Sequence, residues 1–125
     1  MASTINTTSS DSETDPIDRQ SPRPSFQVLI YPVIDFSISY RVVSAVFGHD
    51  HFPSNQMLDN MSTHLSVNSD TPPAFIVHST MDKLVPIENS IIYVNALRRC
   101  NVSVEFHSKD FGPHGFGMYV ICLNK

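Results

Sequence analysis

Two nearly unbroken apolar runs, at residues 26–31 and 74–78, limit the possible folds of this chain most strongly. The first reads Phe-Gln-Val-Leu-Ile-Tyr and the second reads Ala-Phe-Ile-Val-His, so both are rich in residues that favour strands. A strand with one solvated face alternates apolar and polar side chains, whereas a strand covered on both faces is apolar almost throughout. The two runs therefore predict strands of a buried, parallel sheet.

The residues after the second run complete a strand–helix–strand unit. Pro86 suits the first turn of a helix that runs to about Cys100, and Asn101 can take the left-handed position after it. The expected inward stripe of this helix is Ile87, Ile91, Val94 and Leu97. Residues 102–107 then alternate, which predicts a third and less covered strand. Parallel strands need such a crossover, so we expect an α/β fold with about three parallel strands and crossover helices.

The remaining segments are less regular. Residues 1–25 are polar and predict a mobile N-terminal segment, whereas residues 26–125 form part of one domain. Between the first two strands lies an insert with two possible short helices. One runs from Ser39 to Phe47 and ends at Gly48, and the other covers residues 54–65.

Charge and composition exclude several classes of function. The chain has 8 basic and 12 acidic side chains and a net charge of −4, so we do not expect nucleic acid as a partner. No apolar run approaches the roughly 18–20 residues that a membrane span needs, so we expect no membrane partner either. The N-terminus shows no basic region followed by an apolar one, which leaves a cytoplasmic location as the default expectation.

Metal and cofactor sites find little support in the sequence. Cys100 and Cys122 form no Cys-x-x-Cys pair, and they suggest neither a zinc site nor a disulfide framework. His49-Asp50-His51 has the spacing of two metal ligands, but no third or fourth ligand is evident nearby. We interpret this tripeptide as a solvated loop and expect neither a metal nor a cofactor.

Two titratable residues follow predicted strands at the same edge of the sheet. Asp82 comes after the strand at 74–78, and His114 lies in the glycine-rich loop after the strand at 102–107. Ligands of open parallel sheets bind outside the carboxyl ends of the strands. A carboxylate that holds a histidine is what acyl transfer requires, because it fixes the imidazole tautomer and stabilises the imidazolium. The residues alone also allow a capping aspartate and a surface histidine.

The sequences of three segments are more specific for one family of proteins. They are Thr-Pro-Pro-Ala-Phe-Ile-Val-His at 71–78, Asp-Lys-Leu-Val-Pro-Ile-Glu-Asn-Ser at 82–90, and His-Gly-Phe-Gly at 114–117. Together they resemble the C-terminal half of α/β-hydrolase esterases. The nearest group is the acetyl-xylan-esterase-like or endo-xylanase-associated lipase/esterase proteins, related to dienelactone hydrolase and the prolyl oligopeptidase branch. The resemblance covers residues 15–117.

This resemblance implies a truncated α/β-hydrolase fold and a serine ester hydrolase that acts on a small ester or an acetylated carbohydrate. By the same resemblance, Asp82 is the acid of the catalytic triad and His114 is its base. The family's Gly-x-Ser-x-Gly motif is missing, because none of the four glycines flanks a serine. The resemblance thus implies that the chain begins just after the nucleophile and is inactive alone.

A second hypothesis is a non-catalytic fragment or interaction module with a leftover hydrolase fold. A Gly-x-Ser-x-Gly motif encoded upstream of Met1 would favour the esterase, and an in-frame stop codon there would favour the fragment. The sequence leaves the oligomeric state open.

Overall fold

The computed structural model describes residues 21 and 23–118, so most of the polar segment 1–25 and also Cys122 lie outside the described residues. Within that part the chain forms, in order, β1 (Gln27–Ile30), α1 (Tyr40–Phe47), α2 (Asn55–Met61), the 3₁₀ turn η2 (Thr63–Ser66), β2 (Ala74–Ser79), α3 (Glu88–Arg99), β3 (Val104–Lys109) and the 3₁₀ turn η3 (Phe116–Met118). α3, at 12 residues, is the longest helix described. None of the helices described is long and apolar enough to cross a membrane.

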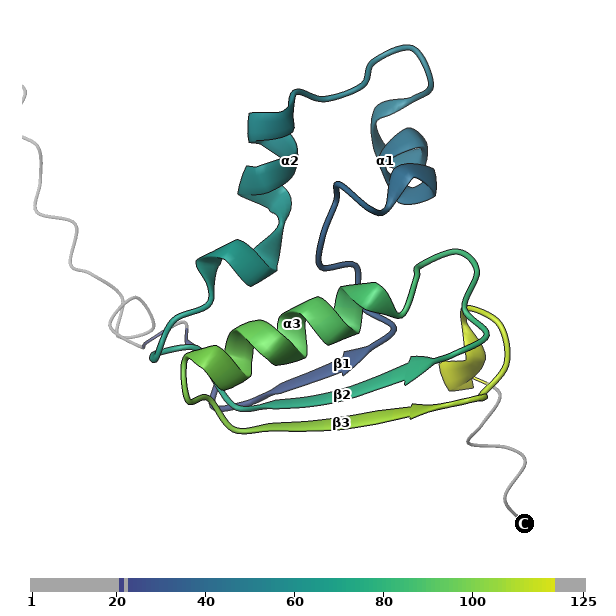
Figure 1. Ribbon diagram of the computed structural model, residues 1–125. Coiled ribbons are helices and arrows are strands. Elements are labelled where there is room, and N and C mark those ends of the chain that lie inside the picture. Colours follow the sequence, from purple (N-terminus) through teal and green to yellow (C-terminus); the bar gives the residue numbers. More distant parts are fainter. Residues whose placement is uncertain (1–20, 22, 119–125) are drawn as a thin grey trace, which may run out of the picture.

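The three strands form one parallel sheet in the order β1-β2-β3. Leu29 stands opposite Ile76, which stands opposite Phe106, so the strands share one register. α3 connects β2 to β3 and lies across one face of the sheet (Figure 1). The predicted α/β architecture with three parallel strands is therefore confirmed, and it places the carboxyl ends of all three strands at one edge.

The core lies between α3 and this face of the sheet. Its buried side chains come from both layers and from flanking loops: Ile34, Ala74, Ile76, Tyr93, Val94, Leu97 and Val102. The predicted inward stripe was wrong at Ile91, which is 42% exposed. The buried face of α3 instead includes the polar residues Asn89 and Ser90, which are tolerated because both make buried hydrogen bonds. Asn101 has the expected left-handed φ of 57°.

The opposite face of the sheet is open among the described residues. Val28, Ile30 and Phe75 are 55%, 45% and 37% exposed. The continuous apolar runs predicted cover on both faces, yet residues 23–118 cover only the face beneath α3. These three side chains and the half-buried Val77, which stands opposite Ile30, form what we call the open sheet face.

The insert between β1 and β2 carries α1 and α2. These two helices lie on the side of α3 that faces away from the sheet (Figure 1). α1 ends at Phe47 and Gly48 follows it, as predicted. The second predicted helix, over 54–65, is instead divided into α2 and η2. The division falls at Ser62, whose hydroxyl donates to the Leu58 carbonyl at 2.8 Å and accepts from the Phe36 amide at 3.1 Å. These two bonds fix Ser62 in an extended conformation that a continuous helix would not allow.

Candidate active site

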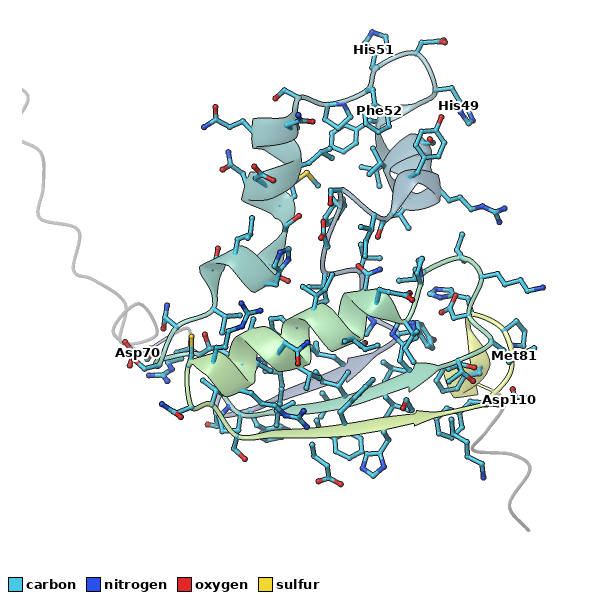
Figure 2. The ribbon with its side chains drawn as sticks, in the orientation of Figure 1. His49, His51, Phe52, Asp70, Met81 and Asp110 are labelled. Atoms are coloured by element: carbon cyan, nitrogen blue, oxygen red, sulfur yellow. The ribbon has the colours of Figure 1, made fainter. Side chains whose placement is uncertain are left out.

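Two loops meet at the carboxyl ends of β2 and β3, and Figure 2 labels Met81 on one and Asp110 on the other. The buried residue Ser79 joins them. Its hydroxyl donates to the Gly112 carbonyl and accepts from the amides of Met81, at 3.1 Å, and Phe111, at 3.2 Å. One serine at the end of β2 therefore fixes both loops against each other.

Asp82 and His114 face each other across this junction. Nδ1 of His114 lies 2.7 Å from Oδ2 of Asp82, which is within hydrogen-bond range. Because an ionised carboxylate can only accept, Nδ1 donates this hydrogen bond, and Nε2 is then the nitrogen that can accept a proton. The Asp82 side chain is fully buried, whereas that of His114 is 29% exposed. His114 is therefore the member of the pair that solvent can reach.

The Asp82 carboxylate is also held by its own loop. Its Oδ1 accepts from the backbone amides of Leu84 and Val85, each at 2.9 Å. Burial by itself would raise the pKa of Asp82. The hydrogen bonds from the Val85 amide, from His114 and from the Leu84 amide outweigh that effect and hold the pKa below its ordinary value. Asp82 is therefore ionised at neutral pH, as the orienting acid of a histidine must be.

A second histidine, which the sequence interpretation missed, lies beneath the loop that carries Asp82, between β2 and α3. We call this segment the acid loop. His78 is fully buried at the end of β2, and its Nε2 donates to the Val85 carbonyl at 3.0 Å. Its Nδ1 is then left to accept from the Ser90 hydroxyl at 2.7 Å. Burial lowers the pKa of His78, which keeps the ring neutral although Oδ2 of Asp82 lies 3.5 Å from Nε2. A histidine that ends a buried apolar run was the available signal.

The imidazole of His114 is supported by aromatic rings. The Tyr31 ring lies against it, with centroids 4.4 Å apart, and Phe116 packs edge-on against Tyr31 at 5.1 Å. Tyr31 directly follows β1 and has a φ of 42°, which is rare for a residue with a side chain. Gly112 and Gly115, on either side of His114, have φ values of 102° and 90° that favour glycine.

A pocket of about 430 Å³ opens beside His114. Its size falls within the usual range for small-molecule sites. The lining comes from α1, from the acid loop and from the loop after β3 that carries His114. Its residues are Arg41, Met81, Lys83, Leu84, Gly112, Pro113 and His114. A ligand in this pocket would contact the exposed edge of the histidine.

Asp35 and Asp110 follow β1 and β3 in the chain, and each is held by a residue of its own loop. The buried Asp35 accepts hydrogen bonds from the amide and hydroxyl of Ser37, and Asp110 accepts from the Gly112 amide. His49 and His51 lie on the loop between α1 and α2, at the far end of the molecule from Met81 (Figure 2). Within residues 23–118, no group of three or more side chains has an arrangement that could hold a metal ion.

The comparison with protein families matches residues 26–119 to the model of the prolyl oligopeptidase family. The chain belongs to this family. An acetylxylan esterase of Xylanibacter ruminicola is 35% identical over 100 residues, which is 76% of this chain. This chain spans only 21% of the length of that relative.

Solved structures give the same fold. An acetyl ester-xyloside bifunctional hydrolase from Caldicellulosiruptor lactoaceticus is 34% identical, with a TM-score of 0.76 over 91% of this chain and 42% of its own. A carboxylesterase from Lactobacillus plantarum is 27% identical, with a TM-score of 0.63 over 79% of this chain and 34% of its own. The three strands and their helices are thus part of an α/β-hydrolase fold, and the predicted family is confirmed.

Proposed function

We propose that this chain carries the acid and the base of a serine ester hydrolase that acts on small esters or acetylated carbohydrates. The observation that carries the proposal is the 2.7 Å contact between a buried, ionised Asp82 and a His114 that lines a pocket. The names of the relatives, an acetylxylan esterase and an acetyl ester-xyloside hydrolase, support the substrate class.

In this proposal the nucleophile is a serine that is not among these 125 residues. Nε2 of His114 takes the hydroxyl proton of that serine as its oxygen attacks the ester carbonyl, and His114 then gives the proton to the leaving alcohol. A water molecule repeats the cycle on the acyl-enzyme. Asp82 stays ionised throughout and stabilises the imidazolium that forms in each step.

The structure also suggests how the geometry is kept. The two backbone amides on Oδ1 of Asp82 leave Oδ2 for the histidine, so the carboxylate cannot rotate without losing three hydrogen bonds. The Tyr31 ring packs against the imidazole of His114 and limits its rotation. Such preorganisation matters, because effective acid–base catalysis depends on hydrogen-bond reach to the reacting atom.

The experiment compares two proteins in the hydrolysis of p-nitrophenyl acetate. One is this 125-residue chain, and the other is the chain extended at its N-terminus through the first encoded Gly-x-Ser-x-Gly motif. We expect saturable hydrolysis only by the extended protein, because nucleophile and oxyanion donors supply most of the rate enhancement. The interaction-module hypothesis predicts that the extended protein is also inactive. Saturable turnover by the short chain, lost on replacing one of its own serines, would refute the division of roles.

A further inference from the structure

The pocket beside His114 has an unusual charge for this chain. The whole sequence carries a net charge of −4, yet among the described residues that line the pocket the charged side chains are the cations Arg41 and Lys83. Within residues 23–118, no carboxylate lines the pocket, since Asp82 is fully buried and directed at His114 and at two backbone amides. A net acidic chain thus presents a local positive site where a substrate would bind.

Both cations are available to a ligand. Arg41 and Lys83 are exposed, and neither forms a salt bridge with any residue in the described part of the chain. They come from different elements, Arg41 from α1 in the insert and Lys83 from the loop that follows β2. Two cations from separate elements that border one pocket can contact one anionic group from two sides. An arginine guanidinium also matches the planar geometry of carboxylate and phosphate groups.

The rest of the lining suits a sugar ring or an acyl chain. Met81, Leu84 and Pro113 give the pocket apolar walls, and most small-molecule pockets combine such walls with a few placed polar groups. With His114 at one wall, an ester held here would have its anionic group near the cations and its ester bond near the base.

We propose that the pocket selects esters whose alcohol part is an anionic sugar, bearing a carboxylate or a phosphate group, with Arg41 and Lys83 as the specificity-determining residues. This inference rests on the proposed function, because it treats the pocket as the substrate site of that hydrolase. In this proposal, α1 contributes to substrate specificity, because it places Arg41 at the pocket.

The test measures binding to the 125-residue chain by heteronuclear NMR titration, which requires no hydrolysis. The probes are methyl glucuronide, glucose 1-phosphate and the neutral methyl glucoside. We expect an anionic sugar to shift the signals of Leu84 and His114 saturably and to bind at least about tenfold more tightly than the glucoside. The anion that binds more tightly identifies the group that is recognised.

Arg41→Gln and Lys83→Gln should each weaken binding of the anionic sugar about tenfold, and 1 M salt should weaken it similarly, because charge interactions are screened. Arg98→Gln, which removes an exposed arginine of α3 outside the pocket, is the matched control and should change nothing. Equal binding of glucoside and glucuronide, absence of binding by all three probes, or indifference to both pocket substitutions would overturn the inference. Because the assay measures binding alone, an extended protein that binds anionic sugars but hydrolyses no ester would refute the proposed function and leave the charged site intact.

Discussion

Replacing the buried histidine His78 is the most informative perturbation of the acid loop. Its ring donates to the Val85 carbonyl at 3.0 Å and accepts from the Ser90 hydroxyl at 2.7 Å. All three residues are almost completely buried, at 0 to 1% exposure. His78→Leu keeps an apolar side chain in the space but leaves the carbonyl and the hydroxyl without partners.

The expected cost follows from those two groups. An unsatisfied buried polar group costs about 1–3 kcal/mol, so His78→Leu should lower the free energy of unfolding by about 2–6 kcal/mol. Total stabilities of domains are about 5–15 kcal/mol, so this variant is close to unfolding. Ser90→Ala is the milder companion, because it leaves only Nδ1 of His78 unpaired and should cost about 1–3 kcal/mol.

The assay is urea denaturation of wild type, both single variants and the double variant. The double variant lacks the unpaired hydroxyl, so its loss should be smaller than the sum of the single losses by about 1 kcal/mol or more. Losses that add within about 0.5 kcal/mol would show that His78 and Ser90 do not depend on each other. A loss below about 1 kcal/mol for His78→Leu would show that the Val85 carbonyl and the Ser90 hydroxyl do not need the His78 ring as a partner.

The same residue predicts a dependence of stability on pH. Burial holds the pKa of His78 below its ordinary value of 6.5, so the unfolded chain binds a proton there more readily than the folded chain does. Stability should therefore be full above about pH 6.5 and fall as the pH drops, by at most about 1.4 kcal/mol per pH unit for one proton. Asp82, whose pKa is also lowered, has the same sign in a more acidic window below 3.8. In a His78 variant that still folds, the slope near pH 6 should be reduced.

Three further predictions concern the loops and the sheet. Asp82→Asn places an amide donor against the Nδ1–H of His114, so ¹⁵N NMR should show that the imidazole proton has moved to Nε2. The rate of an active extended protein should then fall about 10⁴-fold. An unchanged tautomer would contradict this prediction. Gly115→Ala should lower the free energy of unfolding in urea by about 1–2 kcal/mol, because φ is 90° at this position. The cost is one of backbone conformation alone, since an added Cβ meets nothing within 4 Å. An unchanged midpoint of urea denaturation would contradict the positive φ. The open sheet face should make the chain associate at high concentration, and Phe75→Thr should reduce this in light scattering; a wild-type chain that stays monomeric would contradict it.

The order of elements was predictable because it depends on local periodicity. Continuous apolar runs marked β1 and β2, and a proline-initiated amphipathic segment marked α3. Once these elements are parallel strands with a crossover, topology alone brings the loops after β2 and β3 to one edge. That is why Asp82 and His114 could be paired from chain order, although their contact distance could not.

Other features required tertiary contacts that no local pattern encodes. Ile91 matches a helical apolar stripe, but the buried face of α3 is rotated toward Asn89, which accepts hydrogen bonds from the amides of Ile34 and Asp35. The end of α2 depends in the same way on the contacts of Ser62 with distant backbone groups. Arg41 has no motif around it, and only the position of α1 brings it to the pocket.

One kinetic comparison in the extended protein decides whether His114 is the base of an ester hydrolase. His114→Ala is measured beside His107→Ala, which removes an exposed histidine of β3 that forms no part of the pocket. We expect kcat/KM for an acetyl ester to fall at least about 10³-fold in the first variant and to change less than about twofold in the second. If the extended enzyme kept more than about a tenth of its activity after His114→Ala, His114 would not be the base.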